Sequence, residues 1–241
     1  MKILVFQHVL HESPGLIAGY AEGNNIKLTV IEFWKPYNIP DYTNFDGLII
    51  MGGPMGVYDG KDIFPSKDDE VNFIQGALGK IPIIGFCLGS QLLAYVLGAK
   101  VYPNIIDGKR VKEIGYYNID LTREGEIDPI FKNFISPIKV LQWHGDAFDL
   151  PNGATLLSTS VDCKNQAFRY GDKTYGMLFH NEFTPEMVNR LMEIDKEWIH
   201  KDFNFDYERV RKEAEEYKSL MKKQCKQLMD NFVSVLGSST K

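Results

Sequence analysis

Cysteines and long apolar runs are both scarce in this chain, and each scarcity narrows its class. Its 241 residues include three cysteines, Cys87, Cys163 and Cys225, an odd number without metal-ligand spacing. Neither a disulfide framework nor a zinc site is therefore predicted, and we expect a reduced, cytoplasmic protein. No uninterrupted apolar stretch approaches the about 20 residues of a membrane span. The opening "MKILVFQHVL" predicts a first strand and not a signal peptide.

An excess of basic charge is also missing. The formal net charge is −5 at pH 7, which argues against broad binding to nucleic acid or to an anionic membrane surface. No stretch fits the phosphate-binding pattern G-x-x-x-x-G-K-[ST], and no metal or other cofactor is predicted. Hydrophobic residues make up 44% of the chain and charged residues 24%, so a sizeable core can be buried.

Apolar runs alternate with helix-like segments in the first hundred residues. "GLIIM" (47–51) and "IPIIGF" (81–86) are apolar at every position, as in strands that are covered on both faces of a parallel sheet. Helix-like segments follow at 66–79 and 88–98. This alternation predicts an α/β fold with three layers, a doubly wound and mostly parallel sheet between helices.

Capping residues place two further helices. Ser13 and Pro14 predict the start of a helix directly after the first strand. Thr184 is predicted to be the N-cap, with Pro185 at the first position, of a single helix over 184–203. Between them, residues 110–180 hold strand-like runs that should extend or flank the sheet.

The end of the chain has its own pattern. From Tyr207 onward, apolar residues recur every three or four positions on an otherwise lysine- and glutamate-rich segment: Val210, Ala214, Tyr217, Met221, Cys225, Leu228, Phe232 and Val235. We expect residues 1–203 to form one domain and residues 204–241 an amphipathic helical extension that packs on it. A helix that forms a homodimer or binds a partner is the alternative.

A cysteine stands at a point that favours chemistry. In "GFCLGSQLL" (85–93), Gly85 and Gly89 lie two residues either side of Cys87, the spacing of the G-x-S-x-G nucleophile elbow with Cys in place of Ser. The elbow would project the sulfur at a helix N-terminus, where the partial positive charge should lower the pKa of the thiol. A buried core cysteine is the alternative.

A catalytic cysteine needs a base and a residue that orients the base. His180 ends the run "YGMLFH" (175–180), and Glu182 follows two residues later, within reach of the imidazole. Taken alone, the pattern would more simply indicate a structural histidine at a strand end, with its hydrogen bonds satisfied by neighbouring groups. His8, His11 and Cys163 are assigned surface or packing roles.

Three motifs together resemble one family. The chain resembles the class I glutamine amidotransferases in three motifs, which occur in the same order and at similar separations: "GGPMG" (52–56), "GFCLGSQLLA" (85–94) and "FHNE" (179–182). Three more stretches, over 112–122, 143–160 and 165–171, resemble the glutaminase portion of GMP synthase and its free-standing relatives. The likeness covers roughly residues 1–200. It implies a flavodoxin-like form of the predicted sheet.

The resemblance implies a Cys-His-Glu triad. Cys87 would attack the side-chain amide of glutamine, His180 would be general base and acid, and Glu182 would orient it. The backbone N–H groups of Gly53 and Leu88 would form the oxyanion hole. Ammonia would leave, and water would hydrolyse the γ-glutamyl thioester to glutamate.

The same resemblance implies the substrate contacts. Gln91, His144 and Asp146 would bind the α-amino and α-carboxylate groups of glutamine, and the backbone at Met55 and Gly56 would line the pocket.

This chain departs from the family pattern at three positions near the motifs. Leu178 and Asn181 stand where the family usually has the Gln and Pro of "QFHPE", and Ser90 stands where it often has a larger residue. None of these changes alters the triad, but together they bear on the shape of the pocket.

Three functions stay open on the sequence. The first is a GMP synthase-like glutamine amidotransferase that hydrolyses glutamine, alone or for a separate synthetase subunit that accepts the ammonia. The second is a γ-glutamyl peptidase, which would form the same thioester with a peptide amine as leaving group. The third is a non-catalytic regulatory or binding module that keeps the fold.

Overall fold

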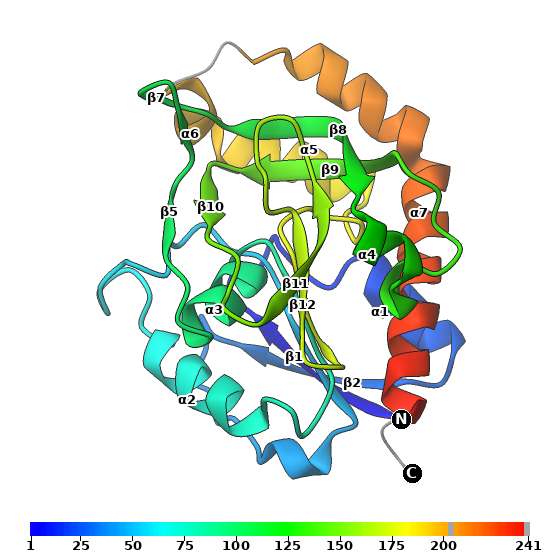
Figure 1. Ribbon diagram of the computed structural model, residues 1–241. Helices are drawn as coiled ribbons and strands as arrows, with labels where there is room; N and C mark the ends of the chain where they lie inside the picture. Colours follow the sequence, from blue (N-terminus) through cyan, green and yellow to red (C-terminus); the bar gives the residue numbers. More distant parts are fainter. Residues whose placement is uncertain (202–204, 239–241) are drawn as a thin grey trace.

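Strands that are apolar at every position form the centre of the fold. In the computed structural model, which describes residues 1–201 and 205–238, β3 (Gly47–Ile50) and β4 (Ile83–Phe86) are buried throughout. They lie in a nine-stranded sheet of order β2-β1-β3-β4-β13-β12-β11-β8-β9 (Figure 1). Burial on both faces is what their continuous apolar sequence predicts.

The sheet has a parallel part and an antiparallel part. The parallel part adds β1 (Lys2–Gln7), β2 (Lys27–Glu32) and β13 (Thr174–Met177). The antiparallel part consists of β12 (Ala167–Tyr170), β11 (Ala154–Thr159), β8 (Glu113–Leu121) and β9 (Ile138–His144). Two small pairs stand apart: β5 (Val101–Pro103) with β10 (Asp146–Phe148), and β6 (Ile105–Ile106) with β7 (Lys109–Arg110).

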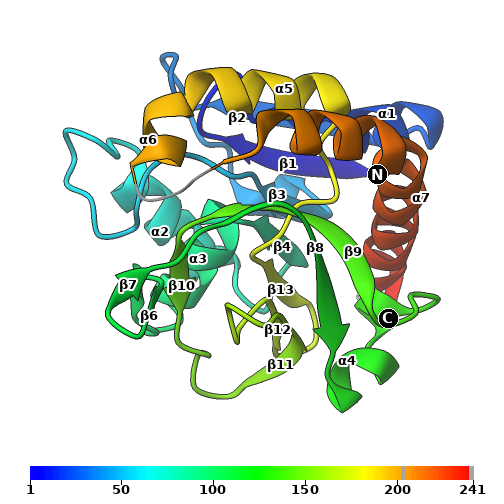
Figure 2. The ribbon, with the colours of Figure 1, turned by 90° about the horizontal axis from the view of Figure 1, so that it is seen from above.

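Helices cover both faces of the parallel part. Because side chains alternate along a strand, Ile3 and Val5 of β1 face α1 (Leu16–Gly23) and α7 (Tyr207–Ser238). Leu4 and Phe6 face α2 (Lys67–Ala77) and α3 (Leu88–Val96). Figure 2 shows these two helical layers on opposite sides of the strands. The predicted three-layer α/β fold is confirmed.

A third cluster of buried side chains joins β8 and β9 to the C-terminal helices. It contains Ile114, Leu141, Val188, Leu191 and Val210. The remaining helical segments are α4 (Arg123–Ile127), α5 (Pro185–Ile194), α6 (Lys196–His200) and the 3₁₀ turns η1 (Tyr42–Asn44) and η2 (Pro129–Phe131). In the described ranges, none of the helices has the length and apolarity that a membrane crossing requires.

The first helix begins later than Ser13 and Pro14 predict. It starts at Leu16, whose N–H donates to the carbonyl oxygen of Glu182 at 2.8 Å. Gly15 precedes it with φ +50°, and a Cβ there would collide with the same carbonyl oxygen. A partner far along the chain therefore caps this helix in place of the serine.

The helix predicted over 184–203 is two helices. Thr184 caps α5 as expected, its Oγ1 accepting the Met187 N–H at 3.3 Å. The first helix, α5, ends at Ile194. The next residue is Asp195, whose carboxylate accepts a 2.8 Å hydrogen bond from Trp143 Nε1, and α6 then runs only to His200. Residues 202 and 203 of the predicted helix lie outside the described residues.

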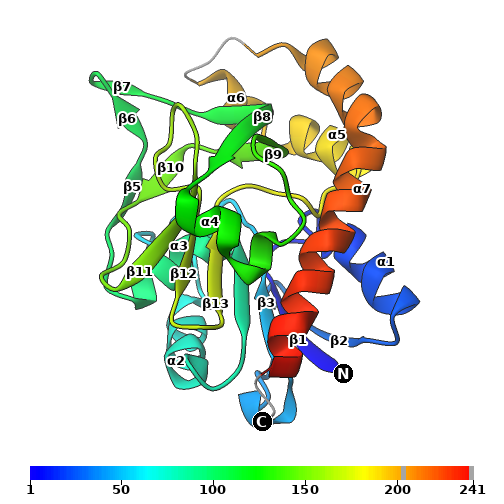
Figure 3. The same ribbon diagram turned by 45° about the vertical axis from the view of Figure 1, so that its right-hand side comes forward.

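The amphipathic tail is the helix α7, and its apolar stripe faces the rest of the chain. Every residue of the predicted stripe is buried except Tyr217, which is half-buried. Asn231 Nδ2 donates to the carbonyl oxygens of Ile130 and Lys132 at 2.8 and 2.9 Å. Figure 3 shows α7 running beside α1 and the β1–β3 strands. The boundary expected between residues 203 and 204 lies outside the described residues, so the division into two units stays a prediction.

Candidate active site

Cys87 lies at a sharp turn between β4 and α3. Its backbone has φ 46° and ψ −108°, a left-handed conformation that is strained for a residue with a Cβ. Its N–H donates to the Met177 carbonyl oxygen at 2.8 Å. A Cβ on Gly89 would collide with the Ile50 carbonyl oxygen, and one on Gly85 would collide with the Gly89 carbonyl group. The turn therefore needs both glycines, as the elbow motif predicts.

His180 and Glu182 come to the same place from the chain that follows β13. His180 Nδ1 lies 2.6 Å from Glu182 Oε1, and both side chains are buried. The second carboxylate oxygen, Oε2, accepts the Asn181 N–H at 2.9 Å, which fixes the carboxylate plane. With Nδ1 turned to Glu182, Nε2 is the ring nitrogen of His180 that is left for the Cys87 thiol, and the two groups lie close enough for each to shift the pKa of the other. The Cys87 Sγ also lies 3.8 Å from the Trp143 carbonyl oxygen, which accepts from the thiol.

The protonation of the pair depends on burial and on neighbouring charge. Burial disfavours the imidazolium of His180, but the Glu182 charge and the hydrogen bonds to Cys87 and Glu182 together raise its pKa well above the usual value. Burial raises the pKa of the Cys87 thiol, and the hydrogen bond and charge of His180 oppose that rise. The lowering expected from the helix N-terminus is thus outweighed by burial, and formation of the thiolate depends on His180.

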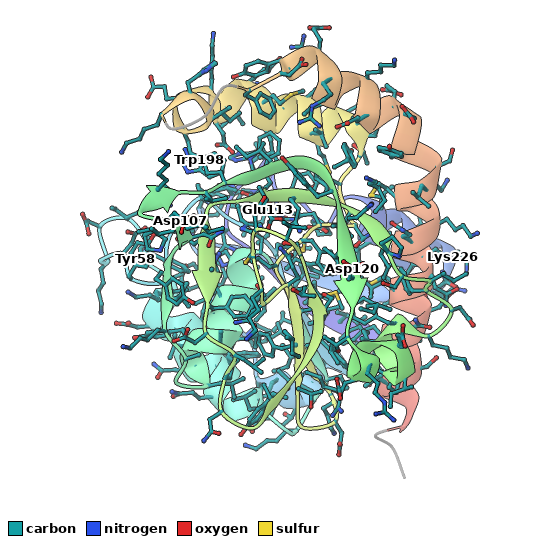
Figure 4. The ribbon with its side chains drawn as sticks, turned by 45° about the horizontal axis from the view of Figure 1, so that its top comes forward. Tyr58, Asp107, Glu113, Asp120, Trp198 and Lys226 are labelled. Carbon is teal, nitrogen blue, oxygen red and sulfur yellow. The ribbon has the colours of Figure 1, made fainter. Side chains whose placement is uncertain are left out.

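A pocket of about 400 Å³ opens over Cys87. All five side chains or backbone segments predicted to contact substrate line it: Met55, Gly56, Gln91, His144 and Asp146. Tyr58 and Trp198 contribute to its wall, and Figure 4 shows both on one side of the molecule, away from Lys226 on α7. The structure therefore gathers the predicted contacts around one space, while their roles stay predictions.

Two of these residues already have partners within the protein. Asp146 accepts hydrogen bonds from Arg110 at 2.7 Å and from the Tyr58 hydroxyl at 2.6 Å. His144 Nε2 lies 3.1 Å from Glu113 Oε2 in a buried pair, and its Nδ1 lies 3.2 Å from the Asp146 carbonyl oxygen. A substrate at this wall would meet side chains that are held in place.

The two backbone donors predicted for the oxyanion hole are neighbours. A Cβ on Gly53 would lie 2.9 Å from Leu88 Cδ2, so the "GGPMG" loop and the start of α3 pack directly together. Within the described part of the chain, neither the Gly53 nor the Leu88 N–H donates to another protein group. Gly53 also lines the pocket. Both donors are thus open for a ligand oxygen.

The residues that differ from the usual family pattern also have visible contacts. Asn181 Nδ2 donates to Gln224 Oε1 of α7 at 2.9 Å, which ties the loop of His180 to the C-terminal helix. Ser90 Oγ donates to the Cys87 carbonyl oxygen at 2.7 Å, inside the elbow. Leu178 is buried in the core.

Glu12 and Asp195 also line the pocket and were missed from the sequence. Both Glu12 and His180 pack against Gly52: a Cβ on that glycine would collide with Glu12 Oε2 and would lie 3.2 Å from His180 Cε1. Burial raises the pKa of Glu12 to about 7, although the nearby His180 charge lowers it. The signal for Glu12 was its place just after the first strand, because parallel α/β sheets bind ligands at the carboxyl ends of their strands.

No group of three or more His, Cys, Asp or Glu side chains is arranged to hold a metal ion in residues 1–201 and 205–238. Acid–base chemistry at Cys87 is what the arranged side chains can supply.

Comparison with known sequences identifies relatives of two lengths. The model of the family "Glutamine amidotransferase class-I" matches residues 15–196. The glutamine amidotransferase-like protein YfeJ of Salmonella typhimurium is 32% identical over 197 residues, 80% of each chain. A GMP synthase [glutamine-hydrolyzing] of Streptococcus thermophilus is 39% identical over 138 residues, which are 56% of this chain but 24% of that protein. The chain thus matches about a quarter of such a GMP synthase.

Solved structures share the whole fold. A glutamine amidotransferase from Thermotoga maritima superposes with a TM-score of 0.84 at 31% identity, covering 96% of this chain and 97% of the other. One from Methylobacillus flagellatus has a TM-score of 0.85 over 97% of this chain and 94% of the other, and at 22% identity it supports the fold alone. On the family match and these relatives, the chain belongs to the class I glutamine amidotransferase family.

Proposed function

We propose that this protein hydrolyses the side-chain amide of glutamine to glutamate and ammonia. The observation that carries the proposal is the buried chain of contacts from Glu182 through His180 to Cys87 at the edge of the pocket. Nucleophile, base and orienting carboxylate are the three groups that acyl transfer through a thiol requires.

The reaction begins with proton transfer from Cys87 Sγ to His180 Nε2. The thiolate attacks the amide carbon of glutamine, and the carbonyl oxygen takes up the negative charge. The N–H groups of Gly53 and Leu88 face that oxygen and stabilise the tetrahedral intermediate. Glu182 keeps the Nδ1 proton in place and balances the charge of the imidazolium.

Collapse of the intermediate breaks the carbon–nitrogen bond. The leaving nitrogen takes the proton from His180 Nε2 and departs as ammonia, while the acyl group stays on sulfur as a γ-glutamyl thioester. A water molecule then gives a proton to His180 and adds to the thioester carbon. The carbon–sulfur bond breaks, glutamate leaves, and the proton returns to Cys87.

The pocket wall would hold the amino acid end of the substrate. Gln91, His144 and Asp146 are the groups proposed for the α-amino and α-carboxylate, with the backbone at Met55 and Gly56 beside them. Because Arg110 and Tyr58 hold Asp146, its carboxylate is already oriented before substrate arrives.

The proposal is tested by ammonia release from glutamine. Purified wild type should release ammonia, and Cys87→Ala should fall to the background rate. Cys163→Ala is the matched control, since Cys163 is also buried but lies outside the pocket over Cys87. Ammonia release that persists in Cys87→Ala would show that Cys87 is not the nucleophile. A wild type that neither hydrolyses glutamine nor reacts with thiol-directed glutamine analogues would favour the non-catalytic module.

A second candidate is hydrolysis of γ-glutamyl peptides by the same thioester. The pocket of about 400 Å³ lies in the usual range of about 300–1,000 Å³ for small-molecule sites, which leaves room for a substrate larger than glutamine. Comparing kcat/KM for glutamine with that for γ-glutamyl dipeptides separates the two candidates.

A synthetase that accepts the ammonia is the partner that the relatives suggest. The GMP synthase that resembles this chain is about four times longer than the part it shares with it. We propose that a separate subunit accepts the ammonia here. A pull-down with the full chain, followed by an ammonia-transfer assay, tests this.

A further inference from the structure

A further histidine–glutamate pair, besides His180–Glu182 and His144–Glu113, lies behind the "GGPMG" loop. His8 follows β1 and is buried, with Nε2 2.9 Å from Glu70 Oε2 on α2. Its Nδ1 lies 2.9 Å from the carbonyl oxygen of Gly52. The other oxygen of Glu70 accepts a 2.7 Å hydrogen bond from Ser66 Oγ. A continuous chain of contacts therefore links Ser66, through Glu70 and His8, to the loop.

Both ring nitrogens of His8 face acceptors. A carbonyl oxygen can only accept, so Nδ1 must carry a proton, and an ionised carboxylate needs a second proton on Nε2. Burial opposes the charge that results, but the Glu70 charge and the hydrogen bonds to Glu70 and Gly52 outweigh it and raise the pKa of His8. Glu12 acts in the same direction. The contacts of both ring nitrogens and this direction of the pKa shift favour the protonated form of His8.

The direction of one peptide bond follows from this contact. The Gly52–Gly53 peptide is trans, so its C=O and N–H point in opposite directions. Because His8 binds the Gly52 oxygen, the Gly53 N–H must point away from His8, and Gly53 lines the pocket over Cys87. A Cβ on Gly53 would lie 3.0 Å from His8 Cβ, so the loop is packed closely against this histidine.

We propose that His8 is a positioning residue: its hydrogen bond to the Gly52 oxygen holds the Gly53 N–H toward the oxyanion, with Glu70 and Ser66 holding His8. The inference rests on the proposed function, in which Gly53 supplies an oxyanion donor. The imidazolium also polarises the peptide that it binds, which strengthens the N–H on the far side as a donor.

Two substitutions of His8 separate its two contacts. Asn carries an amide nitrogen two bonds from Cβ, as Nδ1 is, and can still donate to Gly52. Gln carries its nitrogen three bonds from Cβ, as Nε2 is, and can reach Glu70 but not Gly52. His8→Gln should lower kcat by about 100- to 1,000-fold, the usual effect of losing one oxyanion donor, with KM within about threefold of wild type. His8→Asn should stay within about tenfold of the wild-type kcat.

Two controls exclude a general loss of structure. His200→Gln carries the same substitution at an exposed histidine and should keep wild-type kinetics. Alkylation of Cys87 by iodoacetamide needs no oxyanion hole, so His8→Gln should react at a rate within about threefold of wild type. A wild-type kcat in His8→Gln, or a His8→Asn variant as slow as His8→Gln, would overturn the proposal.

Two further measurements add support that a packing role would not give. Glu70→Gln removes the charge that favours the imidazolium, so the basic limb of the kcat profile should move to lower pH. An unmoved limb would count against the proposal. In a crystal structure of His8→Gln, the Gly52–Gly53 peptide should be rotated; an unchanged peptide would overturn the proposal. This last result decides the role of His8 even if the wild type hydrolyses neither glutamine nor γ-glutamyl dipeptides, an outcome that would refute only the proposed function.

Discussion

The buried pairs His180–Glu182 and His144–Glu113 both lie at the pocket over Cys87, and they differ in which group the second ring nitrogen faces. His180 turns one nitrogen to Glu182 and the other to the Cys87 thiol. His144 lies 3.1 Å from Glu113, but its other nitrogen lies 3.2 Å from a backbone carbonyl oxygen. A histidine paired with a glutamate is thus placed to act as a base at position 180, whereas at position 144 it is a fixed part of the pocket wall.

The surroundings of the two glutamates differ in the same sense. Glu113 also accepts hydrogen bonds from Gln166 Nε2 at 2.7 Å and Ser160 Oγ at 2.8 Å, so it is the centre of a buried polar network. The Glu182 carboxylate, among the residues that the structure describes, is bound by His180 and by the N–H of the preceding residue, Asn181. The contacts of Glu113 should therefore contribute mainly to stability, and those of Glu182 to the reaction.

The largest expected effect compares Glu182→Gln with Glu113→Gln. The amide at 182 can no longer hold the tautomer of His180 or balance the imidazolium, so kcat should fall by about 1,000- to 10,000-fold. Glu113→Gln should stay within tenfold in kcat but lower the free energy of unfolding by about 1–3 kcal/mol, because its donors lose a charged acceptor. Steady-state kinetics and urea denaturation measure both. Equal losses of kcat in the two variants would break the comparison.

Glu12 is a second carboxyl group near His180, but unlike Glu182 it forms no ion pair with the imidazole in the described residues. The pKa of Glu12 is raised from 4.5 to about 7 by burial, so the folded state holds this proton more tightly than the unfolded state does. The contribution of Glu12 to the free energy of unfolding should therefore fall by about 3 kcal/mol as pH rises from about 4 to 8.

Glu12→Gln cannot ionise and should not show this loss. At pH 8 the variant should be more stable than wild type by about 3 kcal/mol, and at pH 4 the two should agree. Urea denaturation at both values measures the difference. Parallel pH profiles for the two proteins would mean that Glu12 does not titrate near neutrality in the folded state.

The smallest effect concerns the thiol itself. Since His180 opposes the rise in the pKa of Cys87 that burial causes, His180→Gln should move the midpoint of the pH profile for alkylation upward. One unit of pKa corresponds to a rate about tenfold lower at pH 7. Iodoacetamide labelling followed by mass spectrometry measures it, with His200→Gln as the control. A faster reaction in His180→Gln would reverse the assigned influence of the imidazole.

Local signals in the sequence predict much of this architecture. The elbow could be predicted because the two glycines that allow it lie two residues from Cys87 on either side. The His180–Glu182 pair could be predicted because its members are two residues apart. The α7 helix could be predicted because its apolar period is continuous. In each case the physical requirement is met by residues that are neighbours in the chain.

The remaining features depend on partners that are distant in sequence. The end of α5 depends on Trp143, 52 positions before Asp195, and the start of α1 on the Glu182 carbonyl. The role of His8 depends on Glu70, 62 positions away. The sequence around these residues does not identify their distant partners, and for this reason His8 was predicted to have a surface or packing role.

The long helix α7 has a consequence for how this protein can be dissected. The family match ends at residue 196, yet side chains of α7 complete the core against α1 and the sheet: Cys225, Leu228, Met229, Phe232, Val235 and Leu236. Fully burying a large apolar side chain contributes about 1.5–3 kcal/mol, and a whole domain has a net stability of only about 5–15 kcal/mol. A fragment trimmed to residues 15–196 would lack these side chains and would expose the surface of α1 and the sheet that they cover, so the limit of the family match does not coincide with the limit of this core.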